Sequence, residues 1–216
     1  MPVTASTSPA ERAEPVLLIL VRHALPERVD GNGSTAHADP GLTADGHAQA
    51  TRLVDALAGE PVDALYTSTM RRAVQTAAPL AAARGLAATT RADLREYDAE
   101  RAEYVPIGQM AQADPETFAR MRAGHLPVHV DAEAFTGRVR SALEEIVAAH
   151  PGRSTAVVVA HAGVLNAYLA AVLGIDRSLP FPLDYVGLTR VVCARDGMRK
   201  PRTVNEIGHV ADLLGS

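Results

Sequence analysis

Two short, mostly apolar runs along the chain each end at a histidine. Residues 16–21 read Val-Leu-Leu-Ile-Leu-Val and lead into Arg22 and His23, and residues 155–160 lead into His161. Unbroken runs rich in Val, Ile and Leu are typical of strands that are buried on both faces of a parallel sheet. The sequence therefore predicts two central strands whose carboxyl ends carry the two histidines.

Helical patterns alternate with the predicted strands. Apolar positions follow a 3.6-residue period across residues 131–150, and residues 162–173 form a second, strongly apolar helix. Two further helices are predicted, one that begins after Thr43 and one that ends at Gly85. Strands that alternate with helices indicate a three-layer α/β/α fold with a mainly parallel central sheet.

The remaining segments predict further strands and an N-terminal tail. Residues 63–67 predict a further strand, and residues 203–204 and 187–194 predict strands at an edge of the sheet. An edge strand there would allow pairing across a homodimer, and the sequence leaves the oligomeric state open. Residues 1–14 show no apolar core and predict a flexible tail, so residues 15–216 form one predicted domain.

The composition is that of an ordinary soluble domain, with 47% hydrophobic and 21% charged residues in a chain of 216. A net charge of −4 provides no general attraction to nucleic acid or to an anionic membrane. No apolar run approaches the length of a membrane span. The single cysteine, Cys193, excludes an internal disulfide and a metal site of several cysteines. These features favour a cytoplasmic protein without nucleic-acid or membrane partners.

The candidate chemistry lies at the ends of the two central strands. If the strands are parallel neighbours, His23 and His161 lie side by side at the sheet edge where α/β proteins bind ligands. Arg22 adjoins His23, and the next predicted helix carries Arg71 and Arg72 in its first turn. Cations are unfavourable at that end of a helix, and a bound anion would explain them. The cluster therefore suits a tetrahedral dianion.

Five sequence blocks resemble, in this order along the chain, those of a known family. The resemblance is to the histidine phosphatase superfamily, also called the phosphoglycerate-mutase-like family, and it covers most of the chain after residue 16. It implies a phosphomonoester hydrolase that works through a phosphohistidine intermediate, with no metal and no cofactor. The blocks are Leu20-Val21-Arg22-His23, Leu42-Thr43-x-x-Gly46-x-x-Gln49-Ala50, Thr67-Ser68-Thr69-Met70-Arg71-Arg72-Ala73, Leu94-Arg95-Glu96 and Val157-Val158-Val159-Ala160-His161-Ala162-Gly163.

The resemblance implies a catalytic role for three residues. His23 corresponds to the nucleophile, His161 to the second catalytic histidine and Glu96 to the proton donor. A nucleophilic imidazole must be neutral, and its other ring nitrogen is expected to donate its proton to a backbone carbonyl. Glu96 must be protonated at the first step, which an apolar setting favours. Asp98 remains open as an alternative proton donor.

The implied phosphate-binding side chains are Arg22, Arg72 and His161. Planar guanidinium groups match the oxygens of a phosphate. In the family block the functional arginine directly precedes alanine, which favours Arg72 over Arg71. Ala24 departs from the family's Arg-His-Gly signature, and a methyl group is accommodated there if φ is negative.

Two other functions are open on the same fold: a phosphoglycerate-type phosphomutase and a non-catalytic phosphate- or phosphopeptide-binding domain. The stretch after Glu96 departs from the acidic block of the mutases, which argues against the first. The substrate is expected to be a small phosphorylated metabolite, selected by the irregular segments 25–41 and 97–130. Three side chains of the second segment either line the substrate mouth or pack in the core: Tyr97, Tyr104 and Met110.

Overall fold

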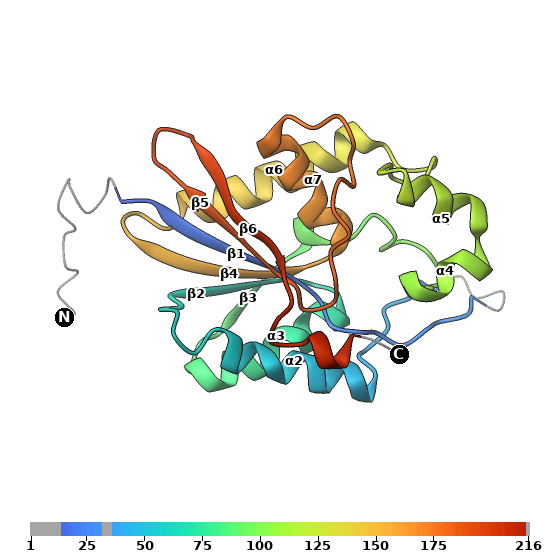
Figure 1. The fold of residues 1–216 in the computed structure, drawn as a ribbon, viewed down its shortest axis with the longest axis horizontal. Coiled ribbons are helices and arrows are strands. Elements are labelled where there is room, and N and C mark those ends of the chain that lie inside the picture. The colour runs from blue at the N-terminus through green and yellow to red at the C-terminus, as the bar shows by residue number, and fades with distance from the viewer. Residues whose placement is uncertain (1–13, 32–35, 215–216) are drawn as a thin grey trace.

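The computed structural model describes residues 14–31 and 36–214. One six-stranded sheet, in the order β3-β2-β4-β1-β5-β6, forms its centre (Figure 1). Strands β3, β2, β4 and β1 are parallel, and β5 and β6 are antiparallel to their neighbours. The predicted α/β class with a mainly parallel sheet is therefore confirmed. The strands are β1 (Val16–Arg22), β2 (Ala64–Ser68), β3 (Ala88–Arg91), β4 (Ser154–Ala160), β5 (Leu188–Cys193) and β6 (Arg199–Glu206).

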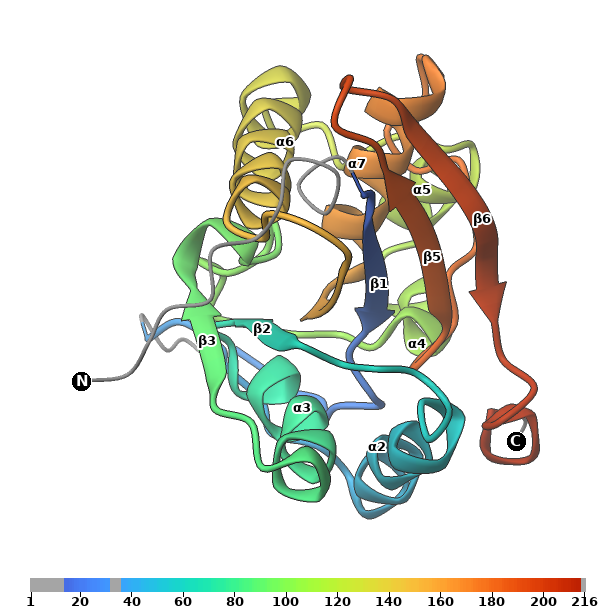
Figure 2. The ribbon, with the colours of Figure 1, turned by 90° about the vertical axis from the view of Figure 1, so that its left-hand side faces the viewer.

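Helices cover both faces of the sheet, with α6 and α7 on one face and α2 and α3 on the other (Figure 2). Successive side chains of a strand point to opposite faces. Leu18 and Leu20 of β1 pack with α6 and α7, and Ile19 and Val21 pack with α2 and α3. Two buried faces explain the unbroken apolar run. The helices are α2 (Ala44–Ala56), α3 (Arg71–Arg84), α4 (Ile107–Ala113), α5 (Pro115–Arg122), α6 (Ala132–Ala148) and α7 (Ala162–Leu173), with short 3-10 turns η1 (Ala92–Leu94) and η2 (Ala211–Leu213).

Local signals set the ends of the helices near the site. The hydroxyl of Thr43 caps α2, because its oxygen accepts a hydrogen bond from the Gly46 amide at 2.9 Å. Gly85 ends α3 in the left-handed conformation, with φ of 63°. Both ends agree with the sequence prediction. The start of α3 lacks such a cap, since its first flanking residue, Met70, makes no capping side-chain hydrogen bond.

The register of β1 and β4 brings the two histidines together. The strands are parallel neighbours, and Arg22 lies opposite Ala160. The next residues, His23 and His161, therefore leave the sheet at the same edge. The amide of His23 donates to the carbonyl of Ala160 at 2.9 Å, which continues the ladder by one bond. The predicted adjacency of the two strands is confirmed.

The prediction of an edge strand at residues 187–194 was wrong. Strand β5 pairs with β1 on one side and with β6 on the other, so β3 and β6 are the edges. Strand β6 is longer than the short apolar pattern at Thr203 and Val204 suggested, because most of its side chains are only partly buried and it lacks a strong apolar signal. Pairing through β5 is therefore not available, and a homodimer stays a prediction.

Of the predicted flexible tail, residues 1–14, all but Glu14 lie outside the described residues. Within residues 14–31 and 36–214, every helix is too short or too polar to cross a membrane.

Candidate active site

The two histidines form the centre of the site. Their ring centroids are 5.1 Å apart, and the rings are tilted by 59°. His23 is 3% exposed and His161 is fully buried. This side-by-side placement is the one expected from the strand ends.

The hydrogen bonding of His23 fixes its tautomer. Its Nδ1 atom lies 2.7 Å from the carbonyl oxygen of Ala24. A carbonyl only accepts, so Nδ1 carries the proton and Nε2 keeps a free lone pair. Burial lowers the pKa of His23 well below its ordinary value, and the positive charges of Arg72 and Arg22 lower it further. His23 is therefore a neutral imidazole with one nitrogen able to attack an electrophile.

Arg22 is held by the loop that precedes β5. Its Nη1 donates to the carbonyl of Leu183 at 2.6 Å. Its guanidinium carbon lies 3.8 Å from the centre of the Tyr185 ring, a cation–π contact. The orientation of Arg22 thus depends on a segment far away in the sequence, which sequence analysis did not identify.

Arg72 is fully buried at the start of α3. Its Nη2 donates to Asp98 Oδ1 at 3.2 Å, and its guanidinium carbon lies 4.5 Å from the centre of the Tyr104 ring. The neighbouring Arg71 is exposed. The structure therefore brings Arg72, and not Arg71, to the histidines, as the order of the residues in the family block implied.

Several buried nitrogen atoms of this cluster have no hydrogen-bond partner among the described residues. An unpaired buried donor is unfavourable, and one on a charged group is more so. An anion with several oxygens would accept hydrogen bonds from the arginine nitrogens and from one protonated ring nitrogen of His161. The unpaired atoms are Nε of Arg22, Nε and Nη1 of Arg72, and both ring nitrogens of His161.

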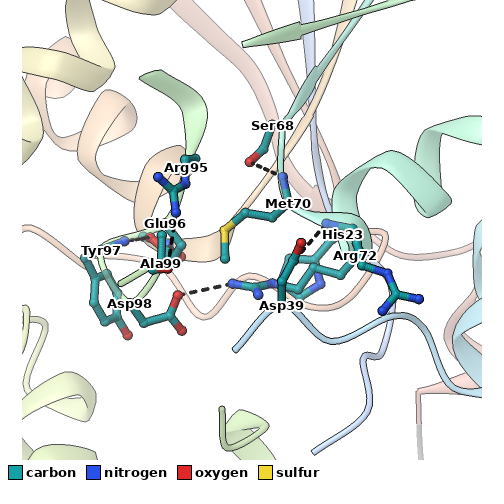
Figure 3. A network of polar contacts seen from close by, with 12 residues as sticks. His23, Asp39, Ser68, Met70, Arg72, Arg95, Glu96, Tyr97, Asp98 and Ala99 are labelled. Carbon is teal, nitrogen blue, oxygen red and sulfur yellow. Dashed lines mark hydrogen bonds and ion pairs between the residues drawn. The ribbon is translucent and has the colours of Figure 1, made fainter. Parts of the chain in front are cut away.

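Glu96 completes the cluster from the loop after η1. Its Oε2 accepts from the Gly163 amide at 2.8 Å, and its Oε1 accepts from the Tyr97 amide at 3.2 Å. Burial raises the pKa of Glu96 to about 7, and the negative charge of Asp98 contributes to the increase. Figure 3 shows Glu96 and Asp98 close together, with the Asp98 carboxylate pointing toward the Arg72 guanidinium. The carboxyl group can therefore give up or take a proton near neutral pH.

Ala24 fits in place of the family's glycine. Among the described residues other than glycine, positive φ occurs at Val186 and Asn205, so Ala24 does not need the left-handed region. Its side chain is fully buried, and its amide donates to the hydroxyl of Thr76 at 2.9 Å. The methyl group of Ala24 is therefore accommodated, because φ at this position is not positive.

A cavity of about 510 Å³ opens from this cluster. Its wall includes Arg22, His23, Arg72 and Glu96, whereas His161 packs against His23 outside the wall. Tyr97, Tyr104 and Met110 also line it. The two roles left open for them are not exclusive, because Tyr97 also packs against the core cluster and Tyr104 is buried.

The segments that line the cavity differ in part from those expected. Residues 97–122 contribute as predicted, but no described residue of segment 25–41 does. That segment instead pairs with the backbone of a cavity-lining residue, because Val29 and Tyr104 exchange two backbone hydrogen bonds. Residues 179–184 supply the opposite wall, and sequence analysis missed them because a loop of this kind carries no periodic signal.

Comparison with known proteins agrees with this geometry. A family model described as histidine phosphatase superfamily (branch 1) matches residues 18–206. The chain belongs to the histidine phosphatase superfamily. As a histidine phosphatase it has the fold and the hydrolase class that the five blocks implied.

Two of the similar proteins, one matched by sequence and one by structure, carry the name of a phosphoserine phosphatase. This histidine phosphatase is 31% identical over 167 residues to phosphoserine phosphatase 1 of Hydrogenobacter thermophilus, which covers 76% of this chain and 79% of the relative. Bacillus stearothermophilus YhfR superposes with a TM-score of 0.73 at 25% identity, covering 90% of this chain and 98% of that one. The Entamoeba histolytica phosphoserine phosphatase superposes with a TM-score of 0.69 at 19% identity, over 90% and 99% of the chains, which supports the shared fold alone.

Proposed function

We propose that this histidine phosphatase hydrolyses small phosphomonoesters without a metal, through a phosphohistidine formed on His23. The observation that carries the proposal is the state of His23. Its Nδ1 atom donates a hydrogen bond to the Ala24 carbonyl oxygen, 2.7 Å away, and this leaves Nε2 unprotonated beside two arginines with unpaired donors. A neutral nucleophile next to fixed positive charge is what phosphoryl transfer requires.

In the first step, Nε2 of His23 attacks phosphorus and the bond from phosphorus to the ester oxygen breaks. Arg22 and Arg72 line the cavity and donate hydrogen bonds to the phosphoryl oxygens, on which charge is spread in the transition state. The proposed third donor is His161, which lies against His23 with unpaired ring nitrogens. The dianion opposes the low pKa of His161, which burial and the arginines cause, and thereby favours its protonated, donating form. Glu96 gives its proton to the leaving alkoxide, so the alcohol departs neutral.

In the second step, water attacks the phosphohistidine. Glu96, now a carboxylate, takes one proton from the water, and the bond from phosphorus to Nε2 breaks. Inorganic phosphate leaves, and His23 returns to its neutral tautomer. Arginine and histidine side chains supply the positive charge in both steps, so the reaction needs no metal ion.

Glu96 is favoured over Asp98 as the proton carrier. The pKa of Glu96 is raised to about 7, where both protonation states are accessible. Asp98 Oδ1 is already engaged, because it accepts a hydrogen bond from Arg72 Nη2 at 3.2 Å. Asp98 therefore fits a role in holding Arg72.

The test is hydrolysis of an aryl phosphate in the presence of EDTA. We expect His23→Ala to abolish the activity, and denatured wild-type enzyme quenched during turnover to carry labelled phosphate on His23. The exposed His125 provides the matched control, since His125→Ala should keep full activity. Full activity of His23→Ala would refute the proposal, and absence of trapped label would refute the covalent step.

Phosphoserine is the first metabolite to assay, because the Hydrogenobacter relative carries the name of a phosphoserine phosphatase. The same incubations separate the alternatives. A phosphomutase returns an isomer of a phosphoglycerate in a bisphosphate-dependent assay, whereas the proposed enzyme releases inorganic phosphate and an alcohol. A binding domain without catalysis forms no labelled His23.

A further inference from the structure

The cavity beyond the phosphate cluster is mainly apolar. The catalytic side chains Arg22, His23, Arg72 and Glu96 occupy one part of its wall. The rest of the wall consists largely of aliphatic and aromatic side chains from two segments. The organic group of a phosphomonoester bound at His23 would lie against this second part.

One apolar wall comes from α4 and α5, which lie beyond the carboxyl ends of the parallel strands (Figure 1). The structure describes every residue of these two helices, and none of them is buried. Four of their apolar side chains are nevertheless half-buried and line the cavity. Their apolar surface thus faces the cavity, where a ligand can cover it. They are Ile107, Met110, Phe118 and Met121.

The opposite wall comes from the loop between α7 and β5. Leu179, Phe181 and Leu183 line the cavity there. The loop is fixed in place by Asn166 of α7, whose side-chain amide donates to the Phe181 carbonyl at 3.0 Å and accepts from the Phe181 amide at 2.8 Å. The two walls therefore form a slot with apolar side chains on both sides, one of them held rigidly.

The charges around the slot disfavour an acidic ligand group. Asp98 and Asp184 both line the cavity. Among the described residues of the wall, Arg122 is the one cation beyond the phosphate cluster, and it is exposed, with its guanidinium 6.0 Å from the Phe118 ring centre. Asp98 is paired with Arg72, whereas Asp184 forms no ion pair among the described residues. A carboxylate on the leaving group would lie near this second acid in an apolar setting, which is unfavourable.

We propose that this phosphatase prefers monoesters of apolar alcohols and phenols over esters such as phosphoserine whose leaving group carries a carboxylate. This inference rests on the proposed function and adds the chemical class of the leaving group. The alkyl or aryl group lies in the slot between α4–α5 and loop 179–183, while the phosphoryl group contacts Arg22 and Arg72.

The test uses a series of n-alkyl phosphates from ethyl to pentyl. Their alcohols are almost equally acidic, so the chemical step changes little and chain length reports contact with the slot. Each buried methylene should raise kcat/KM about fourfold. The gain should come from a lower KM at constant kcat, because the contact is the same before and during the reaction. Pentyl phosphate should also be cleaved with a higher kcat/KM than 4-carboxybutyl phosphate, which has the same chain length.

Two substitutions test the location. Met110→Ser and Phe118→Ser should each reduce the gain per methylene, and both lie on helices without buried residues, so the fold is expected to persist. Val128 is 81% exposed and does not line the cavity, so Val128→Ser is the matched control and should keep the wild-type gain. An unchanged gain in both cavity variants would overturn the assignment to this slot.

The outcomes separate this inference from the proposed function. If the wild type cleaves all the esters with equal kcat/KM, the phosphatase proposal stands and the apolar preference is wrong. If it cleaves none of them and no aryl phosphate either, the proposed function is wrong. In that case calorimetry with ethylphosphonate and pentylphosphonate still tests the slot, since pentylphosphonate should bind more tightly and equal affinity would refute the preference.

Discussion

In the proposed mechanism Glu96 acts as an acid in one step and as a base in the next, and burial raises its pKa to about 7. The proton-donating form is lost as the pH rises through that value. We expect kcat/KM for an alkyl phosphate to fall above neutral pH in the wild type. Glu96→Gln should lose about a hundredfold or more in activity and should lack this decline.

Dividing the wild-type profile by the Glu96→Gln profile isolates this carboxyl, because ionisation of the substrate affects both enzymes equally. We expect the ratio to fall as the pH rises through about 7. A ratio that is constant across the neutral range would show that another group carries the proton.

Gly163 allows Glu96 to approach the start of α7. A Cβ atom at position 163 would lie 2.3 Å from Glu96 Oε1, much closer than atoms can approach. Gly163→Ala should displace the carboxyl and lower kcat by about tenfold or more, while phosphate inhibition changes little. Gly137→Ala is the control, since nothing lies within 4 Å of its added methyl group. Wild-type kcat in Gly163→Ala would indicate that the position of Glu96 does not matter.

At the scale of elements, the loop before β5 positions Arg22. Val186 has φ of 59°, a strained value for a β-branched residue. Its amide donates to the Arg22 carbonyl at 3.0 Å, and the Arg22 amide donates to the Gly187 carbonyl at 3.4 Å. From β6, the Asn205 side chain donates to Pro182 at 3.1 Å. Backbone strain held by several hydrogen bonds beside the proposed catalytic cluster fits a positioning role.

Tyr185 in this loop gives a direct test. Its ring contacts the Arg22 guanidinium, and its hydroxyl is buried without a partner among the described residues. Tyr185→Leu removes the ring and should weaken inhibition by phosphate between about twofold and thirtyfold, the range for a cation–π contact. Tyr185→Phe keeps the ring and should lose little affinity. Equal losses in the two variants would mean that the hydroxyl, and not the ring, supports the site.

The elements that could be predicted from the sequence are those with their own pattern. Strands β1 and β4 have nearly unbroken apolar runs, helix α6 has a clear 3.6-residue period, and both histidines directly follow strand ends. Helix α4 and the role of loop 179–184 could not be predicted, because their apolar side chains face a cavity and the loop has no period. The contact between Tyr185 and Arg22 joins residues that only the tertiary fold brings together.

At the scale of the whole molecule, the site depends on convergence at one edge of the sheet. Strands β1 and β4 bring the histidines, α3 brings Arg72, and the loop after η1 brings Glu96. Each of these groups is buried, so the folded chain contains positive charge with unpaired donors before any phosphate binds. Such a site lowers the stability of the free protein, and an anion that pairs with the donors restores it.

This coupling between binding and stability predicts a measurable shift in melting temperature. Phosphate at about a hundred times its Kd adds about 2.7 kcal/mol to the free energy of unfolding, which raises the melting temperature by several degrees.

Arg72→Met replaces a fully buried cation with an apolar side chain of similar length. Its partner Asp98 keeps 18% of its side chain exposed, so water can still reach that carboxylate. The variant should therefore melt at or above the wild-type temperature in phosphate-free buffer and respond little to phosphate. The exposed neighbour supplies the control, because Arg71→Met should show the full wild-type response. Melting of Arg72→Met several degrees below the wild type, with an undiminished response to phosphate, would mean that Arg72 supports the fold and not the anion.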